Sequence, residues 1–536
     1  MPFTLVRCGL LATLCVAFSA SAQPVGGLGP VPTGAVAAVS LPRMGEAGAM
    51  DLSAERQLGD RIAQLVYQDP EYLDDPALGD YLRAIWQPLV ASARERGDLS
   101  PELAERFAWE LMLSRDASIN AFALPGGYLG VHLGLVAGVD TTDQLASVLA
   151  HELSHVSQRH ISRLVARQSQ QAPLLLGAMI LGALAASAAK NTDIVQAAVV
   201  GGQAVAAQTQ LNFSRDMERE ADRIGYGIHS GAGFDGRGFA EMFGKLQQAS
   251  RLNDDGSFPY LRSHPLTSER MADMKLRHAQ HTADGPGLAP ARPVVSPQWH
   301  AQMAARARVL AQTDASRWQT WLTDAGRASA APTDVAQAVG TRYGAALSAL
   351  QLRQPLQAWQ QVQLLLALPG LDETARRSAQ RLALEIWLAP GAAQVATQPA
   401  APPLVAQLPV WATEALGSAE RTGVLLGARA MVQQGQPSAA SQRLQLWLSE
   451  HPMDAQAWRV LAQAWQAQGQ PLRALRAEAE SRAAVLDVDG AVDRLRAARD
   501  QGRTVAGTDH LELSIIDARY RQLAQRQREL ALERQP

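Results

Sequence analysis

The sequence predicts a mainly helical fold in two parts: a first half that contains a small sheet, and a second half built from repeated helix pairs. Three observations support this prediction. The 536 residues are rich in alanine, leucine and glutamine, which favour helices. Apolar residues recur at helical spacing between residues 145 and 156, whereas those between 107 and 113 alternate as in a strand. A four-residue motif at position 434 returns at position 468, a period of 34 residues.

Length and charge limit the possible functions. A chain of 536 residues is too long for a single core, so two or more domains are expected. The formal net charge is only -2. Such a balance provides no basic surface for a nucleic acid, and we expect no nucleic-acid partner.

Residues 1–22 have the features of an export signal. Arg7 supplies the positive end, a short apolar run extends from residue 8 to residue 19, and Ala20-Ser21-Ala22 forms a small-residue cleavage site. The run is shorter than the roughly 20 residues that a membrane span needs. We therefore expect a cleavable signal peptide and a periplasmic protein.

The two cysteines of the chain, Cys8 and Cys15, both fall inside this signal. The mature chain would then contain no disulfide, which is compatible with the periplasm and excludes a disulfide-stapled scaffold. A lipoprotein signal would use Cys15, but Leu14 occupies the position where that signal has a small residue. The sequence therefore favours a cleaved signal peptide over a lipid anchor.

The next segments are a flexible lead and two helices. Residues 23–48 are rich in glycine, proline and alanine without a period, which is typical of a flexible segment. From Asp51 the pattern becomes helical, and a second helix is expected over residues 77–90. One face of the first helix carries the apolar residues Leu58, Ile62, Leu65 and Val66.

A strand and a hairpin are expected before the central helix. The alternating residues that predict the strand are Phe107, Trp109, Leu111 and Leu113. Residues 119–124 and 128–131 then flank Pro125-Gly126-Gly127, which predicts a hairpin or a bent edge strand. This segment leads directly into the next helix.

Residues 151–155 read His-Glu-Leu-Ser-His and lie inside that predicted helix. A capping-box start at residues 141–144, Thr-Thr-Asp-Gln, supports the helix. Positions i and i+4 share a helix face, so His151 and His155 can present two imidazoles to one metal ion. Glu152 can then act on a water molecule that the metal activates. This is the zincin signature, and its chemistry is metal-assisted hydrolysis of a carbonyl.

Two histidines leave a zinc site incomplete, because a catalytic zinc takes three protein ligands. His160 is the nearest candidate, but on a continuous helix it lies off the ligand face, and we expect it to be a surface residue. Glu218 and Asp222 share a face at i and i+4. One carboxylate can bind zinc and the other can orient a ligand imidazole. A solvated charge cluster is the alternative, and the His-Glu-Leu-Ser-His motif favours the ligand.

Residues 173–207 form two small, apolar halves around a polar turn, each too short to span a membrane. A helical hairpin packed on the domain is the main expectation, and a lid or a surface for membrane or partner contact is the alternative.

Another helix is expected over residues 211–228. Four prolines mark residues 285–297 as a linker, and two separate cores are expected on its two sides.

The second half, residues 298–536, repeats a helix-pair pattern. Gln434-Gly435-Gln436-Pro437 recurs as Gln468-Gly469-Gln470-Pro471, and a weaker copy surrounds Arg353-Gln354-Pro355. The flanking large and small residues fit the tetratricopeptide pattern. Such pairs stack because one pair alone cannot bury its apolar face. Residues 390–409 interrupt the array, and a last helix is expected over residues 511–532.

These motifs in combination resemble the gluzincin metalloproteases, peptidase family M48, which includes HtpX and the CAAX prenyl endopeptidases. The exported, repeat-bearing form is similar to the BepA-type branch. The resemblance covers about 51–280 and the repeat half. It implies a zincin-type metallopeptidase domain with a small sheet over residues 49–284, followed by an α-solenoid of tetratricopeptide-like repeats. It also implies one bound zinc ion and a role in assisting outer-membrane protein assembly.

The resemblance extends to the site. His151, His155 and Glu218 would bind zinc, Glu152 would be the general base, and Asp222 would orient a ligand. Residues 120–131 resemble the family's substrate-side edge strand, and Ser263-His264-Pro265 with Arg270 resembles its His-Pro element. The strand to which an unfolded substrate would add comprises Gly127, Tyr128, Leu129, Gly130 and Val131.

His264 has three interpretations. It would donate a hydrogen bond to the developing oxyanion, or close the fourth zinc position and hold the enzyme latent, or serve only to cap its loop. The sequence leaves these alternatives open.

Two functions from different classes are consistent with these features. The first is an exported zinc endopeptidase that degrades misfolded or stalled envelope proteins, with the repeats docking it to the outer-membrane assembly machinery. The second is a repeat-based periplasmic chaperone or scaffold with minor or latent proteolysis, in which the apolar segment contributes peripheral membrane or partner contact. The intact Glu152 favours the first, because a pure scaffold need not keep a general base.

Overall fold

The computed structural model combines one four-stranded sheet with helices over the rest of the chain that it describes. The described residues are 50–167, 215–251, 259–283, 294–327, 334–392, 397, 402–504 and 509–533. The predicted export signal, the flexible lead and the apolar segment 173–207 lie outside these ranges. Within them, no helix is both long and apolar enough to cross a membrane.

The sheet has the strand order β1-β2-β4-β3. Its strands are β1 (Tyr72–Leu73), β2 (Glu110–Ser114), β3 (Ala121–Leu124) and β4 (Tyr128–His132). β4 pairs in parallel with β2 and antiparallel with β3, whereas β1 pairs antiparallel with β2. The predicted hairpin is therefore confirmed as β3 and β4. Its tight turn depends on two glycines with positive φ, Gly126 at 73° and Gly127 at 87°.

The strand expected from residue 107 begins later than the alternation predicts. Residues Pro101–Arg106 form a short helix, α3, and Phe107 is its C-cap. Trp109 has a φ of 53°, which no extended strand has. The strand β2 therefore starts at Glu110, and the alternating aromatic residues at 107 and 109 belong to the turn that precedes it.

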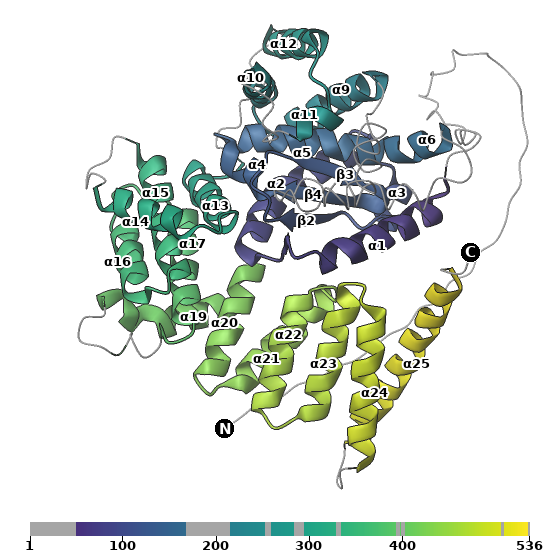
Figure 1. Ribbon diagram of the computed structural model, residues 1–536, viewed down its shortest axis with the longest axis vertical. Coiled ribbons are helices and arrows are strands. Elements are labelled where there is room, and N and C mark those ends of the chain that lie inside the picture. Colours follow the sequence, from purple (N-terminus) through teal and green to yellow (C-terminus); the bar gives the residue numbers. More distant parts are fainter. Residues whose placement is uncertain are drawn as a thin grey trace, which may run out of the picture. The chain divides into compact units, whose positions relative to one another are not determined.

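Ten helices are described in the first half, and α5 lies at its centre (Figure 1). This helix packs against α2, α9, α10 and strand β3. The helix bounds are α1 (Leu52–Gln68), α2 (Pro76–Glu95), α3 (Pro101–Arg106), α4 (Leu133–Gly138), α5 (Thr142–Ser157), α6 (His160–Arg167), α9 (Arg215–Gly231), α10 (Arg237–Arg251), α11 (Tyr260–Ser263) and α12 (Ser268–Ala283). The helix α5 starts at the predicted cap, because the Thr141 hydroxyl accepts the N–H of Gln144 at 3.3 Å.

Among its described residues, the second half contains helices and their connecting turns but no strand. Its helices are α13 (Pro297–Leu310), α14 (Ala315–Arg327), α15 (Val335–Gln351), α16 (Pro355–Leu366), α17 (Glu373–Trp387), α19 (Leu408–Leu416), α20 (Arg421–Gln433), α21 (Pro437–Glu450), α22 (Ala455–Ala467), α23 (Pro471–Ala484), α24 (Val488–Thr504) and α25 (His510–Glu533), with a 3-10 turn at Pro403–Gln407. From α19 to α25 each helix packs against the next, as an α-solenoid requires (Figure 1).

The sequence repeat corresponds to a repeated turn. Gly435 and Gly469 have φ values of 74° and 71°, and each is followed two residues later by the proline that begins the next helix. Arg353 adopts the same conformation, with a φ of 57°, before Pro355 begins α16. The weaker third copy therefore uses the same turn, although it has no glycine there.

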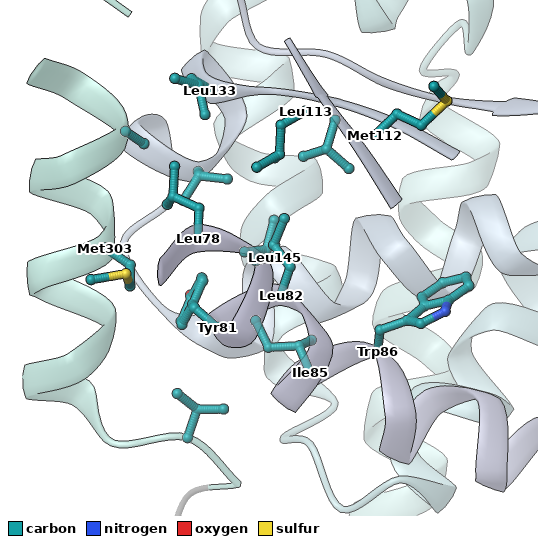
Figure 2. Close-up of a cluster of buried hydrophobic side chains, with 14 of the residues drawn as sticks. Leu78, Tyr81, Leu82, Ile85, Trp86, Met112, Leu113, Leu133, Leu145 and Met303 are labelled. Carbon is teal, nitrogen blue, oxygen red and sulfur yellow. The ribbon is translucent and has the colours of Figure 1, made fainter. Parts of the chain in front are cut away.

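The two halves share buried contacts at the N-terminal end of α2. Met303 of α13 lies in one cluster of buried side chains with Leu78 and Tyr81 of α2 (Figure 2). The Tyr81 hydroxyl lies 2.6 Å from His300 Nδ1. The described residues from 50 onward accordingly belong to one compact unit. The linker at 285–297 stays a prediction, with residue 297 already the first of α13, and these contacts argue against two independent cores.

Arg306 of α13 should be the most sensitive point of this junction. Its guanidinium is buried and binds both carboxylate oxygens of Asp75, the N-cap of α2, at 2.6–3.0 Å. It also binds Glu385 at 2.9 and 3.0 Å.

Arg306→Met should lower the free energy of unfolding by about 3–5 kcal/mol, because Asp75 would remain buried and uncompensated. Urea unfolding followed by circular dichroism measures this loss, and the exposed neighbour provides a control, since Arg308→Met should change it by less than about 0.5 kcal/mol. Equal effects of the two changes would contradict the role given to the junction.

Candidate metal centre

Three helical segments bring four potential metal ligands together. Helix α5 provides His151 and His155, α9 provides Glu218, and His264 directly follows α11. One nitrogen or oxygen atom from each of these four buried residues lies within 4.8 Å of every other. The structure thus unites the three zinc ligands predicted from the sequence, and adds His264 to them.

The donor atoms converge on a single point. His151 Nε2 and His155 Nε2 are 3.0 Å apart, and each lies 3.5 Å from an oxygen of Glu218. His264 Nδ1 lies 3.3 Å from His151 Nε2 and 3.0 Å from Glu218 Oε1. Three imidazoles and one carboxylate crowded in this way match the nitrogen and oxygen ligands that zinc prefers. The residues present therefore fit a zinc ion.

The electrostatics of two of these groups favour metal binding. Burial and the neighbouring His151 ring hold the pKa of His155 well below its usual value, so His155 is neutral and has a lone pair to offer. Burial alone would raise the pKa of Glu218. The adjacent His264 and His151 rings outweigh burial and hold that pKa well below its usual range, so Glu218 is an anion.

The side chain of Asp222 lies where an orienting group would lie. Its Oδ1 is 3.0 Å from His151 Nδ1, the ring nitrogen that points away from the other donors. Arg270 fixes the Asp222 carboxylate with two hydrogen bonds of 2.6 and 2.8 Å. Arg270 also lies 2.8 Å from Glu218 and donates to the carbonyl of Pro265 at 2.9 Å. The arginine of the predicted His-Pro element therefore ties α9 to the segment that carries His264.

A glycine allows α9 to approach this closely. A Cβ atom at Gly225 would lie 3.1 Å from the carbonyl oxygen of Ala150 and 3.2 Å from the Cα of His151. A larger residue would push α9 away from α5. The carboxylates of Glu218 and Asp222 would move with it.

Glu152 lies between the sheet and the donor cluster, and none of its side chain is exposed. Its Oε2 accepts the backbone N–H of Ala123 at 3.0 Å. Its Oε1 makes no hydrogen bond and lies 3.5 Å from His264 Nε2. Burial raises the pKa of Glu152, although the neighbouring His264 and His151 rings oppose this rise. A carboxylate with a raised pKa and an available oxygen is suited to take up a proton.

The predicted substrate strand is wrong in one respect. Four of the five predicted residues, 128–131, lie in β4, which is bonded on one side to β2 and on the other to β3, and Gly127 belongs to the preceding turn. An added strand needs an unpaired edge. Among the described residues β3 pairs with β4 alone, so Ala121–Leu124 provides the edge, and it is the strand that contacts Glu152.

The prediction that His160 is a surface residue is also wrong. Its side chain is fully buried, and its Nδ1 lies 2.9 Å from His155 Nδ1. Burial, partly offset by Glu220, lowers the pKa of His160 to about 4, so the ring is neutral near pH 7. The expectation that His160 is not a ligand stays compatible with the structure, because it lies outside the four-residue cluster.

Sequence reasoning missed the aromatic residue beside the site. Tyr260, in α11, is buried and stacks on His264, with ring centroids 4.6 Å apart and an angle of 29° between the planes. The only signal in the sequence is an aromatic residue four positions before a histidine, and that spacing is not specific. Tyr260 fixes the orientation of the His264 ring in this conformation.

The fold and site define a class of protein, and comparisons with known proteins define its family. A buried His-Glu-x-x-His helix with a glutamate from a second helix makes this chain a metallopeptidase of the zincin class. Residues 87–278 match the model of peptidase family M48. The chain is 30% identical over 533 residues to the beta-barrel assembly-enhancing protease of Escherichia coli (strain K12), with 98% of each protein covered. The chain therefore belongs to peptidase family M48.

Other relatives match smaller shares of the chain. The beta-barrel assembly-enhancing protease of Yersinia pestis is 30% identical over 490 residues, which cover 90% of this chain and 91% of that protein. A relative from Vibrio cholerae is 30% identical over 321 residues, which cover 61% of its length. The mitochondrial metalloendopeptidase OMA1 of Arabidopsis thaliana is 30% identical over 166 residues, 31% of each protein. The similarity to the Escherichia coli and Yersinia pestis proteases thus covers far more of the chain than the similarity to OMA1 does.

Proposed function

We propose that this protein is an exported, zinc-dependent endopeptidase of the periplasm that degrades misfolded or stalled envelope proteins and assists outer-membrane protein assembly. The observation that carries the proposal is the convergence of His151, His155 and Glu218 beside the buried Glu152. The relatives that match over most of their length are named as proteases that enhance β-barrel assembly, and this supports the biological setting.

In the proposed mechanism His151, His155 and Glu218 would hold the zinc ion. A bound zinc ion would supply Lewis acidity that activates water and polarises the scissile carbonyl. Glu152 takes the proton from the attacking water on Oε1 and later delivers it to the leaving amine, while its Oε2 stays bonded to Ala123. Asp222 holds His151 in the orientation and tautomer that a ligand needs.

An unfolded substrate would bind as an added strand along β3. Its backbone would then run beside Ala123, whose N–H contacts Glu152, so the bond to be cleaved would lie close to the base. Backbone pairing requires an extended segment and makes few demands on side chains. This mode of binding therefore favours unfolded or misassembled proteins over compact ones.

The position of His264 supports the latch interpretation. Its Nδ1 is as close to His151 and Glu218 as the other donors are to one another, so His264 would act as a fourth protein ligand where the substrate and water would bind. Substrate access then requires the segment that carries His264 to move away. The geometry supports the latch over the oxyanion interpretation for this conformation.

His264→Ala should therefore raise the basal cleavage of an unfolded substrate. The expected increase reflects the removal of a ligand that competes with water and substrate. The rate of casein cleavage per bound zinc measures it, and Ser263→Ala, which changes the adjacent residue outside the ligand cluster, is the control. A decrease of roughly 100- to 1000-fold would instead identify His264 as an oxyanion donor. An unchanged rate would leave it only the structural role of capping its loop.

The second candidate function, a chaperone or scaffold with latent proteolysis, is favoured by one observation. A cleft of about 1090 Å³ lies between the repeats and the sheet side of the peptidase, where α22 and α23 face α1 and β1. Its lining residues include Tyr67, Asp74, Arg115, Arg459, Arg482 and Arg494. Such a cleft can hold a segment of the assembly machinery or of a client protein without cleaving it. We propose that this cleft is the site at which the repeats bind such a segment.

One experiment separates the two functions. The purified full-length protein is assayed for zinc content and for casein cleavage, before and after a chelator and after zinc is returned. An endopeptidase should lose cleavage with its zinc and regain it with zinc. A scaffold should suppress the aggregation of unfolded outer-membrane proteins equally well in the metal-free and zinc-loaded states. Absence of zinc-dependent cleavage, in both the native protein and His264→Ala, would overturn the proposed endopeptidase.

A further inference from the structure

His160 contacts the metal centre from outside its four potential ligands. We propose that His160 is a positioning residue for His155, holding that ligand in the orientation and tautomer that bind zinc through a chain of contacts that continues to Glu220 and Arg163. The proposal rests on the zinc site proposed above. It assigns a role in metal binding to a residue that lies five positions after the His-Glu-x-x-His motif.

A break in the helix brings His160 back to the site. α5 ends at Ser157 and α6 begins at His160, with Arg159 between them at a φ of 54°, in the left-handed region. On a continuous helix, a residue five positions after His155 would point elsewhere. The left-handed residue breaks the helix, and the His160 ring lies against the His155 ring, with centroids 4.8 Å apart.

The strained conformation of Arg159 is held by its own side chain. Its guanidinium donates to the buried carboxylate of Glu55 at 2.9 Å and to the carbonyl oxygen of Met50. A non-glycine residue in this region costs roughly 1–2 kcal/mol, and such strain persists only where the surroundings determine it. The fold therefore maintains an unfavourable turn at the point that places His160 against His155.

The positions of the hydrogens follow from the contacts. His155 directs Nε2 toward His151 and Glu218, so its lone pair for the metal is on Nε2 and its ring hydrogen is on Nδ1. That hydrogen points to His160 Nδ1 at 2.9 Å, which accepts it. His160 then carries its own hydrogen on Nε2 and donates it to Glu220 Oε2 at 3.1 Å. Each contact fixes the tautomer of the next.

The outer end of this chain is anchored by a charge pair. Arg163 Nη1 donates to the same oxygen of Glu220 at 2.9 Å, and the Glu220 side chain is 30% exposed. The other histidine ligand has a parallel arrangement, in which Asp222 contacts His151 and Arg270 binds Asp222. Both ligands thus have an orienting partner that an arginine supports. For His155 that partner is a neutral imidazole with a carboxylate behind it.

Removing an orienting partner of a zinc ligand typically weakens metal binding about 10- to 100-fold, because the ligand is no longer held in the binding tautomer and orientation. His160→Phe keeps a ring of similar size but can neither accept nor donate. It should raise the zinc dissociation constant by about 10- to 100-fold. His160→Gln can accept from His155 and donate to Glu220, and should bind zinc more tightly than His160→Phe. Glu220→Gln, which changes only the outer contact, should have a smaller effect than His160→Phe.

A matched control comes from a second buried histidine in the same half. His229 of α9 is fully buried, and its Nε2 lies 3.0 Å from the carbonyl oxygen of Asp143, away from the ligand cluster. His229→Phe should lower the unfolding temperature of the metal-free protein without changing its zinc dissociation constant. His160→Phe should raise the zinc dissociation constant even if the His160→Phe protein unfolds at a temperature no lower than the His229→Phe protein does. Competition of the full-length protein with a chelating dye measures the constant.

The reference variant His155→Ala separates failure of this proposal from failure of the zinc site. If His155→Ala loses zinc while both His160 variants bind it as tightly as the native protein, His160 has no positioning role and the zinc site stands. If His155→Ala retains full affinity, the zinc site itself is wrong. Should His160→Phe fail to fold, native affinity in both His160→Gln and Glu220→Ala would reject the proposal, and a weakened Glu220→Ala would support it.

Discussion

Glu152→Gln should abolish peptide-bond cleavage and leave zinc bound. The change replaces a proton acceptor with an amide that cannot accept a proton, and the loss of a general base costs about 100- to 10,000-fold in rate. Zinc should remain because Glu152 lies outside the four-residue ligand cluster. The amide oxygen of the new side chain can still accept the N–H of Ala123, so the contact between α5 and β3 is kept.

Casein cleavage and zinc content, measured on the same preparations, test this expectation. Glu512→Gln provides a control for the substitution itself, since Glu512 is a buried glutamate of α25 in the repeats, bonded to Arg476. That variant should cleave at the native rate. Equal rates in the native protein and Glu152→Gln would remove Glu152 from the mechanism, and loss of zinc from Glu152→Gln would show that its effect is not on proton transfer.

Most of the candidate metal cluster could be predicted from the sequence because its geometry is local. The spacing of four residues puts His151 and His155 on one face of any helix, whatever surrounds it, and the same rule pairs Glu218 with Asp222. The repeat turns at Gly435 and Gly469 are equally local, because a glycine with positive φ before a proline defines the turn. The choice of Glu218 rather than Asp222 as the metal ligand comes only from the resemblance to a known family.

Long-range contacts account for the predictions that failed. The pattern of residues 119–131 predicts a hairpin, but not that β2 pairs in parallel with β4 and leaves β3 as the edge. The prediction for His160 assumes a continuous helix, and the left-handed Arg159 breaks that helix. That residue is held by Glu55, more than 100 positions earlier, which no local pattern reveals.

The junction between the halves shows the same limit. Prolines between residues 285 and 297 indicate a linker by composition, yet Pro297 occupies the first position of α13, where a proline is favourable. α13 then packs on α2 and α4 of the peptidase. Composition alone does not distinguish a proline that separates two domains from one that starts a helix shared between them.

Glu218→Ala should lose zinc as completely as His151→Ala does. Glu218 offers the only carboxylate in the ligand cluster, and its oxygens lie 3.5 Å from the Nε2 atoms of His151 and His155. A catalytic zinc has three protein ligands, so removal of one leaves two. We expect the zinc dissociation constant to rise by more than the roughly 100-fold upper range for an orienting residue. His264 would not compensate, because its position depends partly on its hydrogen bond with Glu218.

Glu220→Ala is the matched control, because it removes a second glutamate of α9 that lies outside the ligand cluster. Its carboxylate contacts His160 and Arg163 rather than the donor atoms, so the loss of affinity should be small beside that of Glu218→Ala. Competition with a chelating dye gives both constants under identical conditions. If Glu218→Ala retains full zinc while Glu220→Ala loses it, the wrong carboxylate has been assigned to the metal. If Glu218→Ala loses zinc while Glu220→Ala binds it only slightly more weakly than the native protein, α9 supplies the third ligand from Glu218 and supports His155 indirectly from Glu220.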